Sequence, residues 1–461
     1  MGSFTQRSRF VAKRRRLRDN AEVTSSMSWE SPMNRSIDAL VLSLTVRTGN
    51  YRPTHLIRVL LGMLLIGIDV GSGLLIAQGI GGSVTKSTER TSEETGTSSE
   101  EAGWVDLFQD NSFAGWVRTN TPQQTWQFKD DLLICSGKPI GEIRTKKMYQ
   151  NFVLELEWRH LVPGGNAGIF VWADDITSRG VPFHRGIEVQ VLENAYGNTQ
   201  SHTTHGDIFP IHGATMVPVN GRGGSRAFPT ENRSNASPEW NHYRIECLDG
   251  EISLAVNGKV VTRGKQCLPS RGYLCLESEG GVVHYRNVRI QELPDTNIPE
   301  DRIAISDRGY SSIYSGLGFD GWEVGTSGKW KSNDWILSYE GTSEESGSIK
   351  STMVSSNQGF LLDFRLKDPV STVAISGVFD REVSLVGSGF LSALSKRGQW
   401  NRLEVRFEEG HVGIHLNGSE IKPAQNWPKG TVGDEAMLEI KAVGSVEFAN
   451  LYVQSREPVV D

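Results

Sequence analysis

The sequence predicts an all-β protein with two antiparallel β-sandwich domains, on three observations. Short runs in which apolar and polar residues alternate recur with turn signals about every 8–12 residues, which is typical of a sandwich. Gly is abundant, at 50 of 461 residues, and no long helical period appears after residue 100. The pattern of strands and turns also repeats once along the chain, so two similar domains are expected.

The alternation is clear in the first domain. In residues 152–159 and 252–257 every second residue is apolar, as in a strand with one buried face. The repeat is clearest where Glu239-Trp240-Asn241 is echoed by Gln399-Trp400-Asn401. Sixteen residues after each of these asparagines comes an Asn-Gly pair, a strong signal for a hairpin turn. We therefore expect sandwiches over about 104–293 and 306–456.

The N-terminal region, residues 1–81, has the pattern of a targeting segment. A basic stretch, Lys13-Arg14-Arg15-Arg16, precedes an apolar run over residues 59–68, which resumes after Asp69 and ends at Ala77. The first run suits the core of a signal peptide, whereas both runs together are long enough to span a membrane. We expect an exported, periplasmic or cell-surface protein, with either a cleaved signal or a membrane anchor in residues 56–77.

The charge composition narrows the classes of molecule that the protein is expected to bind. The formal net charge is −6, which gives no general attraction to nucleic acid. Residues 82–103 are rich in Ser, Thr and Glu, so they are expected to form a disordered linker.

The four cysteines match no zinc pattern, and the sequence leaves open whether one pair forms a disulfide or all are buried thiols. They are Cys135, Cys247, Cys267 and Cys275.

Residues 184–213 are the predicted functional site. They contain four of the ten histidines, at the point where the second repeat has a shorter segment without His. In the strand expected over 186–191, Glu188 and Gln190 point to the same side. Polar side chains that converge on one sheet face are not needed for folding, so they indicate a binding or catalytic site in the first domain.

Residues 104–293 resemble the 3-keto-disaccharide hydrolase domain, and the second repeat resembles it weakly. The motifs that carry the resemblance are Leu107-Phe108, Gly115-Trp116, Glu157-Trp158-Arg159, Gly165-Asn166-Ala167-Gly168-Ile169-Phe170, Ile187-Glu188-Val189-Gln190, His205-Gly206-Asp207-Ile208-Phe209, Glu239-Trp240-Asn241, Val256-Asn257-Gly258 and Tyr285-Arg286-Asn287-Val288. The resemblance implies a concanavalin-like jelly roll that acts on carbohydrate. One departure is that Glu277 and Glu279 stand where many members carry Gln and His.

The implied substrate is a 3-keto-glycoside, whose C3 carbonyl acidifies the hydrogen on C2. A base can remove this hydrogen, and the enolate can then expel the group at C1 before water adds back. The candidate acid and base groups are Glu188, His205 and Asp207. Arg159 is the candidate for stabilising the enolate, Asn166 and Gln190 for orienting sugar hydroxyls, and Glu157 and Glu279 for further substrate contacts. Alternatively, a divalent metal ion held by Glu188, His205 and His202 supplies the electrophile.

Two other functions stay open. The same face would serve a non-catalytic carbohydrate-binding protein. A conventional glycoside hydrolase would use Glu188 and Glu279 as its pair of carboxylates. Against this, Glu188-x-Gln190-x-x-Glu193 has Gln where concanavalin-like glycosidases place an acid. Ordinary structural roles also remain for Glu188, as an ion-pair partner of Arg159 or Arg185, and for His205, as a turn residue.

Overall fold

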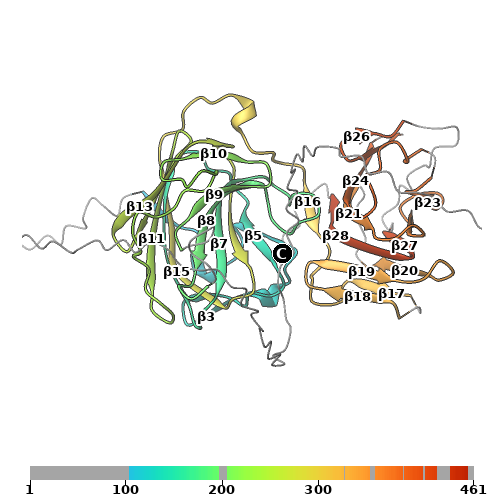
Figure 1. Cartoon of the computed structure of the whole chain (residues 1–461), viewed down its shortest axis with the longest axis horizontal. Helices are drawn as coiled ribbons and strands as arrows, with labels where there is room; N and C mark the ends of the chain where they lie inside the picture. Colours follow the sequence, from blue (N-terminus) through green and yellow to red (C-terminus); the bar gives the residue numbers. More distant parts are fainter. Residues whose placement is uncertain are drawn as a thin grey trace, which may run out of the picture. The chain divides into compact units, whose positions relative to one another are not determined.

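The computed structural model describes residues 103–196, 205–325, 328–352, 359–387, 389–408, 411–422 and 437–454. The prediction of an all-β protein is confirmed, because the described elements are strands and three short 3-10 helices (Figure 1). The helices are η1 (Gln109–Asn111), η2 (Gln123–Thr125) and η3 (Glu300–Arg302). No described helix is long and apolar enough to cross a membrane, and the predicted signal or anchor lies outside the described residues.

The first sandwich consists of a larger and a smaller antiparallel sheet. In spatial order, the larger sheet contains β10 (Thr215–Pro218), β13 (Lys259–Leu268), β12 (Glu251–Val256), β11 (Asn241–Leu248), β6 (Phe152–His160), β15 (Val283–Glu292), β4 (Leu132–Cys135) and β3 (Trp126–Lys129), and β1 (Trp104–Asp106) pairs with β15. The smaller sheet contains β2 (Trp116–Thr119), β5 (Gly141–Thr145), β14 (Tyr273–Ser278), β7 (Asn166–Ala173), β8 (Gly186–Leu192) and β9 (Ile208–Ile211).

The second sandwich follows the same plan. Its larger sheet contains β18 (Trp330–Asn333), β19 (Ile336–Glu340), β28 (Ser445–Gln454), β21 (Gly359–Leu366), β24 (Trp400–Glu408), β25 (His411–Leu416) and β26 (Ser419–Glu420), and β16 (Tyr310–Ser312) pairs with β28. Its smaller sheet contains β17 (Trp322–Val324), β20 (Ser346–Ser351), β27 (Glu439–Val443), β22 (Thr372–Ser376) and β23 (Val383–Ser384). The predicted hairpin turns form at equivalent places, with positive φ at Asn257-Gly258 and Asn417-Gly418.

Each sandwich has its own apolar core between its two sheets. In β8, the side chains of Ile187, Val189 and Val191 enter the first core. Because side chains alternate along a strand, Glu188 and Gln190 lie on the opposite, outer face of the smaller sheet. In Figure 1, β8 lies between β7 and β9, as the pairing requires. Side chains on the outer face of β8 therefore have neighbours on the strands at both of its edges.

The four cysteines are free, buried thiols, and none of them forms a disulfide.

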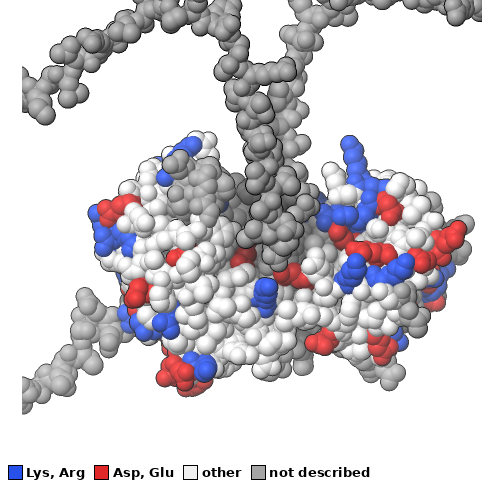
Figure 2. Space-filling view, turned by 60° about the horizontal axis from the view of Figure 1, so that its bottom comes forward, with Lys and Arg blue, Asp and Glu red and all other residues white. Residues whose placement is uncertain are grey.

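On the face seen in Figure 2, Lys and Arg residues are interspersed with Asp and Glu residues. This mixed charge on the described surface agrees with the small net charge of the sequence.

Candidate active site

The outer face of the smaller sheet gathers acidic and amide side chains from four neighbouring strands. Glu142 on β5 is the cross-strand partner of Glu277 on β14. Gly168 on β7 pairs with Gln190 on β8, one step along from Glu188. These side chains are buried although none belongs to the apolar core. A sheet face that buries several carboxyl groups costs folding free energy, which makes it a strong candidate for function.

Gly168 allows two of these carboxyl groups to approach each other. A Cβ atom at this position would lie 2.8 Å from Oε2 of Glu277 and 3.0 Å from Oε1 of Glu188. The two oxygens therefore face each other over the glycine and are separated by no more than the sum of these distances. The motif Gly165-Asn166-Ala167-Gly168 thus leaves room for these carboxyl groups and lets a ligand approach the backbone closely.

A chain of amides fixes the third glutamate. Gln190 Nε2 donates a hydrogen bond of 2.9 Å to Asn166 Oδ1. Asn166 Nδ2 in turn donates to the Glu279 carboxylate. The structure therefore brings together four of the residues singled out in the sequence, namely Glu188, Gln190, Asn166 and Glu279, and adds Glu277 to them.

Burial and mutual repulsion change the acidity of the three glutamates. Burial, followed by the charge of Glu279, raises the pKa of Glu188 well above its usual range. The same two causes, in the same order, raise the pKa of Glu277. Burial also raises the pKa of Glu279, to about 7, while a hydrogen bond from Glu277 acts in the opposite direction. Glu188 and Glu277 therefore hold their protons more strongly than ordinary glutamates do, and Glu279 is partly ionised at neutral pH.

Asp207 and Arg226 form an ion pair beside these groups. Arg226 Nη1 donates a hydrogen bond of 3.0 Å to Asp207 Oδ2, and Asp207 is fully buried. The Arg226 guanidinium carbon lies 3.3 Å from the centre of the Phe209 ring, and Phe209 is the cross-strand partner of Glu188. The charge of Arg226 counteracts the rise in the pKa of Glu188, so this cation acts on the site.

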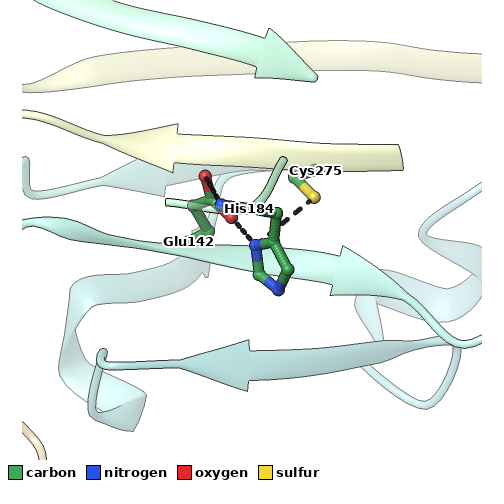
Figure 3. A group of neighbouring side chains, drawn as sticks. All are labelled: Glu142, His184 and Cys275. Atoms are coloured by element: carbon green, nitrogen blue, oxygen red, sulfur yellow. Dashed lines mark hydrogen bonds and ion pairs between the residues drawn. The ribbon is translucent and has the colours of Figure 1, made fainter. Parts of the chain in front are cut away.

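A second buried group adjoins the glutamates. His184 Nδ1 bonds to the Glu142 carboxylate, and the same nitrogen lies 3.9 Å from Cys275 Sγ (Figure 3). All three side chains are buried, and their ligand atoms lie within 4.8 Å of one another, so they could hold a metal ion. They do not form a nucleophile–base relay, because Glu142 and Cys275 share one ring nitrogen and burial raises the pKa of the Cys275 thiol.

Glu157 and Arg159 do not lie in this site. They belong to β6 of the larger sheet and alternate with core residues, so they lie on the outer face of the opposite sheet. Glu157 bonds to Arg286 and Asn287 and lines a cavity of about 550 Å³ on that face. Arg159 lies over the ring of Trp240, 4.6 Å from its centre. The sequence shows that Glu157 and Arg159 share a side, but not which sheet they belong to.

Only two members of the predicted metal group, Glu188 and His205, belong to the described residues. The His205 side chain interacts with Asn232 and with the charge of Glu193 at the end of β8, and burial lowers its pKa. His202 lies outside the described residues. Glu188 does not use Arg185 as a partner either, since Arg185 forms two hydrogen bonds of 2.9 Å with Asp174.

Three residues of the site were not proposed individually from the sequence, namely Glu142, His184 and Arg226, although His184 is the first residue of the predicted segment 184–213. Glu142 carries a usable signal, because Gly141–Thr145 has the same alternation of inward apolar and outward polar residues as β8. His184 and Arg226 follow no strand pattern and reach the site through tertiary contacts alone.

Part of the chain is similar to known proteins. Residues 103–291 match the family of the 3-keto-alpha-glucoside-1,2-lyase-like domain. Similar solved structures include a "putative glycosyl hydrolase" from Parabacteroides distasonis ATCC 8503, at 21% identity over 42% of this chain and 96% of that chain, with a TM-score of 0.34. Another is the β-glucanase of Bacillus licheniformis, at 12% identity over 42% of this chain and 100% of that chain, with a TM-score of 0.29.

A third is the carbohydrate binding module CBM66 from Bacillus subtilis, at 11% identity over 39% of this chain and 96% of that chain, with a TM-score of 0.28. No curated protein sequence matches the chain significantly. The family match covers the first sandwich and includes every glutamate of the site. The first sandwich is therefore similar to the 3-keto-alpha-glucoside-1,2-lyase-like domain over residues 103–291.

Proposed function

We propose that the first sandwich cleaves the glycosidic bond of 3-keto-glycosides by removing the C2 proton and eliminating the group at C1. The family description names a 1,2-lyase of 3-keto-glucosides. The substrate's own carbonyl makes this chemistry accessible, because the enolate formed on losing the C2 proton is stabilised at the C3 oxygen. The protein has to supply a base, an acid and a group that favours the enolate.

The observation that carries the proposal is the unequal acidity of Glu188 and Glu279. A general base works best when its pKa is close to the working pH, and the pKa of Glu279 is about 7. Burial and the charge of Glu279 raise the pKa of Glu188 well above its usual range, which favours its protonated, acidic form. Two carboxyl groups with different environments are the usual arrangement for a base and an acid in one site.

In the proposed reaction, the Glu279 carboxylate takes the C2 proton and the electron pair moves into the enolate. The enolate re-forms the C3 carbonyl as the C1–oxygen bond breaks, leaving a double bond between C1 and C2. Glu188 gives its proton to the leaving oxygen. Addition of water across the double bond completes a net hydrolysis, whereas release before addition makes the protein a lyase.

Arg226 replaces Arg159 as the proposed stabiliser of the enolate oxygen. It is a cation whose charge acts on Glu188, and its side chain retains 22% exposure, so a ligand can reach it. The Asn166 amide donates to the Glu279 carboxylate and accepts a hydrogen bond from Gln190, and both amides line the same face. Together these residues give the site a base, an acid and a cation on one surface.

A divalent metal ion is a second proposed source of electrophilic assistance. Glu142, His184 and Cys275 combine carboxylate, imidazole and thiol, a ligand set that suits Zn²⁺. The test is the zinc content of the purified chain and of its Cys275→Ser variant. Equal and negligible zinc in both would rule out this site, and the three residues would then be a buried structural unit.

Direct hydrolysis of unoxidised glycosides is the competing enzymatic function, and the close approach of Glu188 and Glu277 over Gly168 favours it. Retaining glycosidases place two carboxyl groups about 5–5.5 Å apart, and inverting ones about 6.5–9.5 Å apart. The raised pKa of both Glu188 and Glu277 opposes this function, because one of the pair has to be ionised.

The deciding experiment compares product release by the full chain from a 3-keto-glucoside and from its unoxidised parent. Cleavage of the keto sugar alone supports elimination, and cleavage of the parent supports direct hydrolysis. If neither is cleaved but sugar binding is measurable, the first sandwich is a carbohydrate-binding module. Export to the periplasm or cell surface is proposed from the N-terminal sequence pattern, and fractionation of cells that express the chain tests it.

A further inference from the structure

A turn of the first sandwich is held by the outer face of the larger sheet in the second sandwich. The turn comprises residues 177–183 and immediately precedes His184. Its contacts with the second sandwich are hydrogen bonds from both backbone and side chains. They join Thr177 Oγ1 to Tyr452 Oη (2.8 Å), Arg402 Nη2 to Thr177 O (2.9 Å), Asn450 Nδ2 to Ser178 O (3.0 Å) and Val181 O (2.9 Å), Gly180 N to Asp363 Oδ2 (2.8 Å), and Arg179 Nη1 to Asn417 Oδ1 (2.7 Å).

Asp363 is the centre of this contact. Its side chain is fully buried, and its carboxylate accepts hydrogen bonds of 2.7 and 2.8 Å from Arg402. It also accepts a hydrogen bond of 2.7 Å from Asn450 Nδ2, in addition to that from the Gly180 backbone. A buried carboxylate is tolerated because each of these donors compensates for lost water, so removing one partner is costly.

Gly180 fits the second sandwich closely. Its φ is +73°, and a Cβ atom would lie 2.2 Å from Cγ of Trp400. Trp400 occupies the repeat position of Trp240, whose ring lies beside Arg159 and Arg286 in the first sandwich. Trp400 keeps the equivalent contact within its own sheet, with Arg365 over its ring at 4.5 Å, and in addition packs against the turn.

The equivalent face of the first sandwich is open. In the register of the paired strands, Asp363, Arg402 and Asn450 occupy the places of Glu157, His242 and Asn287. These last three line the cavity of about 550 Å³ on the larger sheet of the first sandwich. A face that is a cavity in one copy is thus a surface for a peptide turn in the other, which indicates that the second copy is specialised for this contact.

The turn connects directly to the glutamates. Thr177 forms an isolated antiparallel bridge with His184, and Ser178 N donates a hydrogen bond of 2.8 Å to Phe183 O. His184 bonds to Glu142, the cross-strand partner of Glu277. The residues held by Asp363 and Arg402 are therefore one backbone bridge away from the histidine beside the site.

We infer that the second sandwich is a built-in support that positions His184 against Glu142, through the binding of turn 177–183 to Asp363, Arg402 and Asn450. Its role in catalysis rests on the proposed function of the glutamate site, whereas its role in holding the turn does not. Asp363 and Arg402 are positioning residues, because they act on the site through His184 and have no contact with the glutamates.

The test is the Asp363→Asn variant of the full chain, with Asp368→Asn as the matched control. Asp368 lies in the second sandwich and bonds within it, to Ser371, Val370 and Ser445. We expect hydrogen exchange in residues 177–184 to rise by about tenfold in Asp363→Asn and to stay unchanged in the control. On a 3-keto-glucoside, kcat should fall by about tenfold with KM within about twofold.

Equal exchange in the two variants overturns the inference. If the wild-type chain has no activity, the proposed function fails, but the exchange measurement still decides whether the second sandwich holds the turn. Tyr452→Phe is the second variant, in case Asp363→Asn does not fold. It removes only the hydroxyl group bonded to Thr177, and exchange should rise by about threefold in the same residues.

Discussion

Glu188 and Glu277 face each other across Gly168, with one oxygen 3.0 Å and the other 2.8 Å from the position of a Gly168 Cβ atom. Two carboxyl groups this close in a buried site cannot both ionise at moderate cost. Glu279 is the nearby group that ionises most readily, because its pKa is about 7. The site therefore combines two carboxyl groups that hold their protons strongly with a third that acts as a base near neutral pH.

Replacing Glu279 by Gln should abolish most turnover while sugar binding persists. The amide keeps the shape of the side chain but cannot accept the C2 proton, so we expect kcat on a 3-keto-glucoside to fall by about 10²–10⁴-fold. Glu246→Gln is the control, since Glu246 is exposed on the larger sheet. Steady-state kinetics and calorimetric sugar binding measure both quantities. Full activity of Glu279→Gln would remove Glu279 from the mechanism.

The pH dependence of kcat/KM should have its acidic limb near pH 7. A base has to be ionised in the free enzyme, and the pKa of Glu279 is about 7, so activity rises as the pH increases through this value. At higher pH, activity should decline as Glu188 loses the proton that the leaving oxygen requires. A limb near pH 4–5 would contradict the assignment, because an ordinary solvent-exposed glutamate titrates there.

Gly168→Ala should lower activity strongly because its Cβ atom would push the Glu188 and Glu277 carboxyl groups away from each other. We expect a fall in kcat/KM of about tenfold or more, since misplaced catalytic groups lose orientation. Gly115→Ala is the matched control, since a Cβ atom there would contact nothing within 4 Å. Unchanged activity in Gly168→Ala would show that the two carboxyl groups need not be close.

The alternation of apolar and polar residues predicted the outer face of β8, and with it Glu188 and Gln190, because burial of one sheet face imposes a period of two. The same pattern correctly placed Glu157 and Arg159 on one side of a strand, but that strand belongs to the larger sheet and not to the sheet of the site. Alternation defines two sides of a strand and carries no information on which sheet the strand joins. That choice depends on pairing between distant segments, such as β6 with β11 and β15.

The order of strands also explains why Glu142 was not predicted and why His184 was not given a role of its own within segment 184–213. Glu142 becomes a neighbour of Glu277 only through the pairing of β5 with β14, across more than a hundred residues of sequence. His184 depends on a turn that the second sandwich holds. Local patterns identify a polar face, whereas its full set of residues follows from long-range register.

Substitutions of Glu157 and Arg159 test the correction to the site. Glu157→Gln and Arg159→Ala should each leave kcat/KM within about twofold of the wild type, because both side chains lie on the outer face of the larger sheet. Because the partners of both side chains are partly exposed, the loss of these contacts should lower the free energy of unfolding by less than about 1 kcal/mol. A loss of activity comparable to that of Glu279→Gln would return these residues to the mechanism.

The glutamate site should also make the protein less stable as the pH rises. The pKa of Glu279 in the folded chain, about 7, exceeds its usual value of 4.5. A carboxyl group of this kind stabilises the fold below its unfolded pKa, and that contribution is lost as the pH increases through the folded pKa. Glu279→Gln removes this penalty, so at pH 8 its Tm should exceed that of the wild type by about 3–6 °C, and at pH 4 the two should agree. Thermal unfolding of both chains and of Glu246→Gln across this range measures the difference. A variant that gains stability at pH 8 while losing turnover would show that the site is kept acidic for catalysis at the expense of the fold, and equal Tm values at both pH values would contradict the raised pKa.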